Sequence, residues 1–185
     1  YVKQFLVPYG EYVPFRSVLG NLVPRFDPEI PRDMIPGQEP GAMDVAGTIV
    51  GTTICWDIAQ DRAVYGSVKA GASFIAVQTS NATFADFGRG VQPQQQWAIS
   101  RLRAIETGRW AVVASTNGIS GFINPHGDVV EQLPSRTAAT AVQTIDLASG
   151  ETWATRLGFP VSWLIGVMAL AGLIAGKRHK RKEHV

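Results

Sequence analysis

The sequence predicts an α/β fold in which helices cover a sheet, and three observations support this prediction. Apolar and β-branched stretches alternate with stretches of helical periodicity along residues 48–115. Two of the helical stretches stop at a glycine, Gly71 and Gly108, and glycine is the residue that most often follows a helix end. A turn sequence at 124–128 then joins two further apolar stretches, as in a hairpin. Alternating strands and helices are typical of a layered α/β domain.

Each expected element has its own signal. Strands are rich in β-branched and apolar residues, whereas helices repeat apolar residues every three or four positions. The expected strands are 1–7, 48–54, 73–80, 110–115, 119–124, 129–133 and 138–145. The expected helices are 61–70 and 95–107. The second helix would place Ala98, Leu102 and Ile105 on one apolar face. The proline-containing stretch 21–41 is expected to be an irregular surface loop.

The positive charge of the chain is concentrated in its last residues. The 185 residues carry 17 basic and 15 acidic side chains, a net charge of +2. The tail 177–185 sets five lysines and arginines against a single glutamate, so the body before it is net negative. A nucleic-acid-binding domain would carry a basic stripe on its folded body, so no nucleic-acid partner is expected. With a single cysteine, an internal disulfide is excluded.

Residues 157–176 form a stretch of 20 residues without a formal charge, bounded by Arg156 and Lys177. At about 1.5 Å per residue, a helix of this length matches a hydrocarbon core of about 30 Å. We therefore expect a transmembrane helix over 157–176 and a basic cytoplasmic tail over 177–185, because positive charge beside a span stays inside. The body 1–156 would then lie on the outer face of the membrane. A buried core helix, followed by a tail that binds acidic partners, is the alternative.

Cys55, the only cysteine, follows the strand 48–54 where a helix is expected to begin. Backbone N–H groups at such a turn can stabilise both a thiolate and the oxyanion of an attacked carbonyl, which favours a nucleophile. An inert apolar residue at the end of a buried strand is the alternative. His179 and His184 fall in the tail and His126 in a turn, so an active Cys55 would depend on lysine and carboxylate groups.

Lys3 and Glu11 are the candidates for these groups. They flank an apolar segment and a Pro-Tyr-Gly turn near the start of the chain. A lysine ammonium can hold a thiolate in its charged form, and a carboxylate can take and return protons. Two solvated surface charges are the alternative.

Three separated stretches together resemble the nitrilase-type domain of the apolipoprotein N-acyltransferase family. They are K-x-x-L-V-P-Y-G-E-Y-V-P from Lys3 to Pro14, ICWDI over 54–58, and SNATF…RLRAIETGR…STNGISGFINPHGDVV within 80–130. The resemblance implies a partial nitrilase-like α-β-β-α sandwich over 1–156, truncated at its amino terminus and followed by the last membrane helix of the enzyme. The 185 residues are then expected to be a carboxy-terminal portion that is inactive alone.

The resemblance also implies a reaction and a set of residues. The superfamily uses a Glu–Lys–Cys triad, so Cys55 would be the nucleophile and Lys3 the triad lysine. Glu11 would be an additional active-site glutamate, and the general-base glutamate would lie upstream of residue 1. A fatty acyl chain would pass from a membrane phospholipid to Cys55 as a thioester, then to the amino-terminal amine of diacylglyceryl-cysteine on an apolipoprotein. No cofactor and no metal ion is implied.

Supporting residues follow from the same resemblance. The backbone N–H of Trp56 would form the oxyanion site together with Lys3. Where the family has Cys-Tyr-Glu or Cys-Phe-Glu, this chain has Asp57, a carboxylate one methylene shorter. A histidine expected before RLRA is replaced by Gln96. Candidates for contact with acyl chains at a gate, or else ordinary core or loop aromatics, are Phe84, Phe87 and Trp97.

Two other functions stay open. A membrane-anchored carbon–nitrogen hydrolase would use the same triad on a small amide or nitrile, with water as the second nucleophile. A catalytically inactive nitrilase fold would serve as a binding scaffold for lipoproteins.

Overall fold

The computed structural model describes residues 1–18, 30–82 and 91–182, apart from the side chains at 159, 162, 174–175 and 177–182. Its regular elements are β1 (Ala42–Val45), β2 (Thr48–Ile54), the 3-10 helix η1 (Cys55–Ala59), α3 (Asp61–Lys69), β3 (Phe74–Thr79), α5 (Val91–Thr107), β4 (Ala111–Ser115), β5 (Gly121–Ile123), β6 (Val129–Gln132) and α6 (Trp153–Lys182). The bounds of β2 agree with the prediction, and α5 begins four residues earlier than expected.

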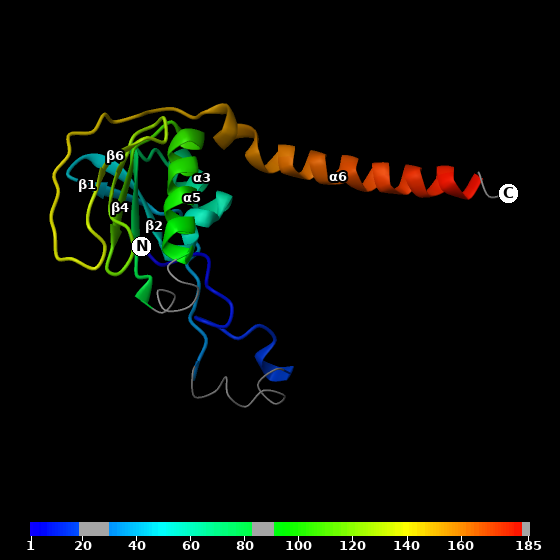
Figure 1. Ribbon diagram of the computed structural model, residues 1–185, viewed down its shortest axis with the longest axis horizontal. Coiled ribbons are helices and arrows are strands. Elements are labelled where there is room, and N and C mark those ends of the chain that lie inside the picture. The colour runs from blue at the N-terminus through cyan, green and yellow to red at the C-terminus, as the bar shows by residue number, and fades with distance from the viewer. Residues whose placement is uncertain (19–29, 83–90, 183–185) are drawn as a thin grey trace.

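The described strands form one six-stranded sheet that follows the chain order from β1 to β6. β2, β3 and β4 are parallel neighbours, whereas β1, β5 and β6 pair antiparallel. Parallel neighbours need a crossover connection, which α3 and α5 supply. Two right-handed crossovers that advance in the same direction place both helices on the same face of the sheet, and Figure 1 shows α3 and α5 side by side there. The predicted α/β class is confirmed.

The core lies between the sheet and these two helices. Its apolar residues come from η1, from both helices and from the strands β3 and β4, with one from β5. The members are Ile58, Val64, Tyr65, Val68, Ile75, Val77, Trp97, Ala104, Ala111, Val113 and Ile123. Burying this apolar surface is the main contribution to the stability of the layer pair.

β1 is a strand that the sequence analysis missed. It pairs with β2 through a two-residue turn in which Ala46 and Gly47 have φ angles of +52° and +82°. Two successive positive φ angles match the twist of a tight hairpin, and glycine adopts them without steric cost. The turn is closed by a hydrogen bond of 2.8 Å from the Gly47 N–H to Asp44 Oδ1.

The predicted strands over 1–7 and 138–145 are wrong, because neither segment forms a ladder with the sheet. Residues 1–7 are held by side-chain contacts instead, as described below. In the second segment Val142 is 95% exposed. This part of the chain runs around the outside of the sheet toward α6 (Figure 1). Its later part is fixed by a hydrogen bond of 3.1 Å from the Ala148 N–H to the Ser73 carbonyl.

The first turn of α6 is attached to the body. Thr152 Oγ1 donates to the Glu106 carbonyl at the end of α5, and Thr155 is buried beside it. At Gly158 a side chain would meet the ring of Tyr65 at 2.7 Å, so glycine allows α6 to approach α3 closely. The helix therefore starts from a defined position on α3 and α5.

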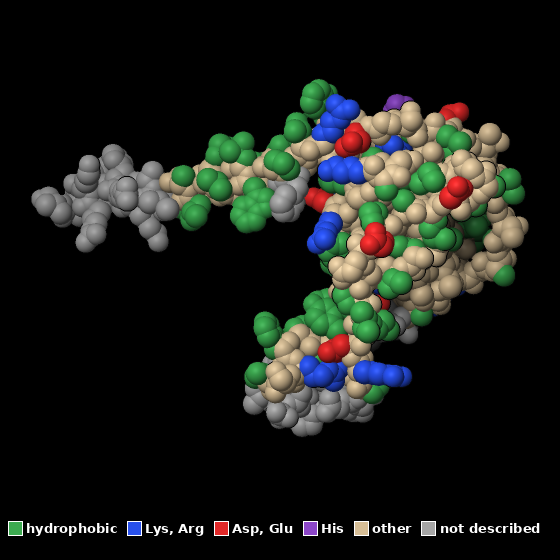
Figure 2. All heavy atoms as spheres, turned by 180° about the vertical axis from the view of Figure 1, so that it is seen from behind, with side chains coloured by type: hydrophobic (Ala, Val, Ile, Leu, Met, Phe, Trp, Pro, Cys, Tyr) green, Lys and Arg blue, Asp and Glu red, His purple; other side chains and the backbone are tan. Residues whose placement is uncertain are grey.

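Beyond these contacts α6 extends away from the body (Figure 1), and apolar side chains lie along both visible edges of its described part (Figure 2). Among the residues that the structure describes, no helix meets the length and apolarity required to span a membrane. The expected span over 157–176 gains no support from that finding.

Candidate active site

Cys55 is the first residue of η1 and directly follows β2, at the edge where the parallel strands end. Its φ angle is +51°, in the left-handed region that residues other than glycine and asparagine rarely adopt. Such a conformation costs about 1–2 kcal/mol, so surrounding contacts must hold it. The residue is partly exposed, which leaves the thiol accessible.

Cys55 lines a cavity of about 300 Å³. The walls come from the segment before Glu11, from η1 and from the amino-terminal half of α5. The lining residues are Val7, Pro8, Cys55, Trp56, Ile58, Ala59, Gln92, Gln95, Gln96 and Ile99. Apart from the three glutamines and the thiol, these side chains are apolar, so the cavity suits an apolar group next to a reactive sulfur.

Asp57 connects the Cys55 turn to the start of the chain. It is fully buried and accepts hydrogen bonds from the Phe5 N–H at 2.8 Å, the Tyr1 hydroxyl at 2.8 Å and the Ile54 N–H at 3.2 Å. A buried carboxylate is stable only when donors surround it, as here. Burial, together with the hydrogen bond to Asp57, raises the pKa of Tyr1 well above its usual range. Asp57 therefore organises the turn from inside rather than facing the cavity: it is absent from the cavity lining.

Lys3 and Glu11 form a partly buried ion pair. Lys3 is 8% exposed, and its Nζ lies 2.7 Å from both carboxylate oxygens of Glu11. The turn between them brings Glu11 back: its N–H donates to the Val7 carbonyl, and Glu11 Oε2 accepts the Val7 N–H, both at 2.8 Å. Because Val7 lines the Cys55 cavity, the ion pair lies directly behind its wall. The structure thus brings the two candidate residues Lys3 and Glu11 into contact with each other.

The structure does not join Lys3 to Cys55 directly. Among the hydrogen bonds of the described residues, none connects Nζ with the sulfur. In the described part of the chain, no group of three or more His, Cys, Asp or Glu residues could hold a metal ion. The arrangement provides a thiol at the edge of an apolar cavity, with an ammonium–carboxylate pair behind the part of the wall that Val7 forms.

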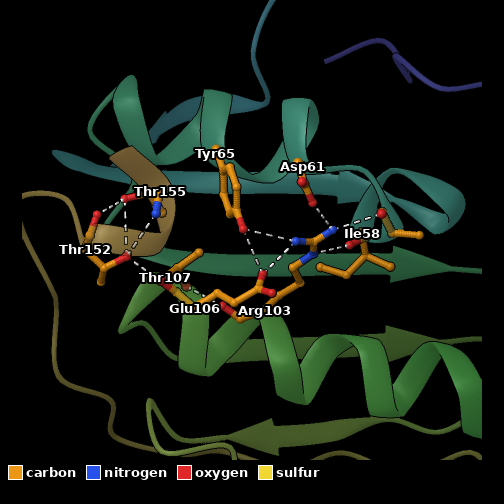
Figure 3. A network of polar contacts seen from close by, with 9 residues as sticks. Ile58, Asp61, Tyr65, Arg103, Glu106, Thr107, Thr152 and Thr155 are labelled. Atoms are coloured by element: carbon orange, nitrogen blue, oxygen red, sulfur yellow. Dashed lines mark hydrogen bonds and ion pairs between the residues drawn. The ribbon is translucent and has the colours of Figure 1, made fainter. Parts of the chain in front are cut away.

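α5 holds both ends of η1, a role that the sequence analysis did not find. Gln96 Nε2 donates to the Cys55 carbonyl at 3.0 Å. Arg103, two helical turns later, donates to the carbonyls of Ile58 and Ala59, each at 2.9 Å. Figure 3 shows the Arg103 guanidinium enclosed between Asp61, Tyr65 and Glu106. The sequence did contain a signal for this role: the polar residues Gln96, Ser100, Arg103 and Thr107 of α5 recur every three or four positions, as on one face of a helix.

The aromatic candidates are placed differently from one another. Trp56 is 42% exposed and lines the cavity beside Cys55. Trp97 is buried in the core cluster and does not line the cavity, which favours a packing role. Phe84 and Phe87 lie outside the described residues.

The fold and this site define the class of protein. Residues 1–155 match the model of the carbon-nitrogen hydrolase family, and the chain belongs to this family. The sheet with a cysteine after a parallel strand is thus the family's α/β fold.

Relatives within that class are more specific. Proteins named apolipoprotein N-acyltransferase from Mycolicibacterium smegmatis and Nitrosomonas europaea are 34% and 33% identical to this chain. The alignments cover 96% and 98% of this chain but 29% and 36% of those proteins, so the chain spans about a third of their length. A solved amidase from Nesterenkonia sp. is 23% identical over 58% of this chain and 42% of its own, with a TM-score of 0.46. A TM-score below 0.5 is too low to define a shared fold, so the family match carries the assignment.

Proposed function

We propose that the chain carries the nucleophile of an acyltransferase that moves a fatty acyl group from a phospholipid to the amino-terminal amine of a lipoprotein. The observation on which this rests is Cys55: a partly exposed thiol, in a left-handed turn after a parallel strand, at the edge of an apolar cavity. The relatives named apolipoprotein N-acyltransferase, which align with nearly the whole chain, support this choice of reaction.

The reaction has two balanced steps. The Cys55 thiolate attacks the ester carbonyl of the phospholipid; the C–O bond breaks, and the lysophospholipid leaves after taking up a proton. The lipoprotein amine then attacks the thioester carbonyl, the C–S bond breaks, the amine loses a proton and the thiolate returns. A covalent intermediate of this kind is nucleophilic catalysis and gives ping-pong kinetics. Lys3 and the Trp56 N–H would stabilise the oxyanion, with Glu11 fixing the lysine. The general-base glutamate would come from a segment upstream of residue 1.

A lipid substrate requires the cavity to lie at a bilayer, and α6 gives a physical reason for this location. Its described side chains beyond Gly158 include seven large apolar residues that are 44–66% exposed: Val161, Leu164, Ile165, Val167, Met168, Leu170 and Leu173. A helix that is apolar on all sides needs apolar surroundings. We therefore propose that 157–176 lies across the inner membrane of a bacterium, with the body outside and the basic tail in the cytoplasm.

The test is detection of the intermediate. Membranes from cells that express the complete gene are incubated with a phospholipid that carries a labelled acyl chain. We expect label on Cys55 through a bond that neutral hydroxylamine cleaves, and no label in a Cys55→Ala variant. Labelled Cys55 that transfers its acyl chain to a lipoprotein amine distinguishes the transferase from a hydrolase, in which water would be the acceptor. Normal lipoprotein acylation by Cys55→Ala would overturn the proposal and favour the scaffold alternative.

A further inference from the structure

The carbonyl group of Cys55 has a dedicated partner in the structure. Gln96, which is 7% exposed, donates from Nε2 to this carbonyl at 3.0 Å. We propose that Gln96 is a positioning residue: its amide holds the Cys55 peptide in the left-handed conformation that presents the thiol to the cavity. The inference rests on the proposed function only in taking Cys55 as the nucleophile.

The orientation of the Gln96 amide is fixed by its other contacts. Gln96 Oε1 accepts from the Thr79 hydroxyl at 3.1 Å and from Asn81 Nδ2 at 2.9 Å. A carbonyl oxygen only accepts hydrogen bonds, so the side of the amide that faces Cys55 must be the NH₂ group. Both ends of the Gln96 side chain are therefore engaged, and the amide has a single orientation.

The network extends to the end of the sheet. Asn81 Nδ2 also donates to Gln92 Oε1 at 2.7 Å, and Asn81 Oδ1 accepts from the Ser115 hydroxyl at 3.0 Å. Asn81 is 1% exposed, and the network joins β3 to α5 and to the end of β4. A satisfied buried network of this kind is rigid, and it transmits that rigidity to Cys55 through Gln96.

The Cys55 peptide is thereby held on both sides. Asp57 Oδ2 accepts the Ile54 N–H before it, and Gln96 donates to the carbonyl after it. A left-handed φ at a non-glycine residue persists only where its surroundings over-determine it. Removing the Gln96 donor would release one of the two restraints while leaving the core intact.

The experiment compares variants at position 96 in the complete membrane protein, using the rate at which iodoacetamide alkylates Cys55. This rate reports thiol presentation whether or not acyl transfer occurs, so its outcome is separate from that of the proposed function. We expect Gln96→Leu to lower alkylation and the kcat of thioester formation by roughly tenfold to a hundredfold with little change in KM, because a misplaced nucleophile loses mainly the chemical step.

Two conservative variants separate positioning from packing. Gln96→His keeps one donor and one acceptor and should retain most of the rate. Gln96→Glu keeps the shape, but an ionised carboxylate cannot donate. Because burial raises the pKa of a carboxyl group, the rate of this variant relative to wild type should rise as the pH falls from about 8 toward about 4, where protonation restores a donor. The partners Thr79, Asn81 and the Cys55 carbonyl are neutral, and the titratable groups of the facing turn are the Cys55 thiol and the Asp57 carboxylate.

The matched control is Thr107→Val. Thr107 is buried on the same face of α5, where its hydroxyl donates to the Arg103 carbonyl at 2.7 Å. This variant loses a buried hydrogen bond without touching η1, so it should be destabilised while Cys55 is alkylated at the wild-type rate. Wild-type alkylation in all three Gln96 variants, or an equal loss in Thr107→Val, would overturn the inference.

Discussion

α5 and α6 both depart from the rule that a helix buries its apolar face, and they do so for different reasons. α5 buries polar side chains, including Gln96, Ser100, Arg103 and Thr107, while Leu102 is 58% exposed. α6 exposes large apolar side chains, and in Figure 2 apolar side chains lie along both visible edges of its described part. α5 faces backbone carbonyls of η1, which need donors, whereas α6 beyond its first turns has no described protein surface to face. The polarity of a helix face therefore reflects what it meets.

The largest expected effect is the loss of Arg103, because its guanidinium satisfies several groups at once. Arg103→Met would leave the carbonyls of Ile58 and Ala59 without these donors and the carboxylates of Asp61 and Glu106 without their cation. Breaking a buried pair costs about 3–5 kcal/mol, and the low end applies because Asp61 is 42% exposed. The free energy of unfolding in detergent, measured by denaturant titration, should fall by about 3 kcal/mol. Arg103→Lys keeps the charge but not the several N–H donors of the guanidinium. Its free energy of unfolding should therefore lie between those of wild type and Arg103→Met.

A loss below about 1 kcal/mol in Arg103→Met would contradict the idea that α5 holds η1 through its polar face. In that case the buried arginine would contribute little beyond the contact of its guanidinium with the Tyr65 ring.

The next prediction compares α5 and α6 by making the same leucine-to-arginine substitution in each helix. Leu102 on α5 and Leu164 on α6 are each 58% exposed, so they match in residue type and exposure. Leu164→Arg should disfavour membrane insertion of α6 by about 2–3 kcal/mol, because an arginine in a hydrocarbon core is costly. Leu102→Arg should leave insertion unchanged. Accessibility of a carboxy-terminal tag to protease outside intact spheroplasts measures the difference.

Equal tag accessibility in the two arginine variants would show that α6 and the exposed face of α5 meet the same surroundings. The proposed membrane location of 157–176 would then fail, while the acyl-transfer proposal would still rest on its own test.

Sequence reasoning succeeded where the determinants are local. The strand 48–54 and the helix beginning at Asp61 were predicted because a β-branched run and a glycine stop are properties of neighbouring residues. The turn that returns Glu11 to Lys3 was visible as Pro-Tyr-Gly. The predicted strand over 1–7 failed because distant Asp57 holds that segment by its side chain.

The predicted apolar face of α5 also shows where local sequence patterns are insufficient. Ala98, Leu102 and Ile105 do lie on one face, but this face is exposed. Both the apolar and the polar residues of α5 repeat with the helical period, so periodicity alone could not decide which set is buried. The deciding groups are the η1 carbonyls, some forty residues away in the chain, and only the fold brings them to α5. Gln96 was accordingly noted as a departure from the family pattern, without a role.

The smallest expected effect concerns Tyr65 on α3, which contacts Arg103 and Glu106 on α5 (Figure 3). Its hydroxyl donates to Glu106 Oε2 at 3.2 Å, and Tyr65→Phe should cost about 1 kcal/mol near neutral pH. Burial first, and then the charges of Glu106 and Asp61, raise the pKa of Tyr65 from 10.0 to about 12. Because the folded state holds this proton more tightly, the stabilisation is complete below about pH 10 and is lost as the pH rises through about 12. Denaturant titrations of wild type and Tyr65→Phe across this pH range should therefore show that the difference in their free energies of unfolding becomes smaller as the pH rises. A constant difference would mean that the phenol is not buried between α3 and α5 as described.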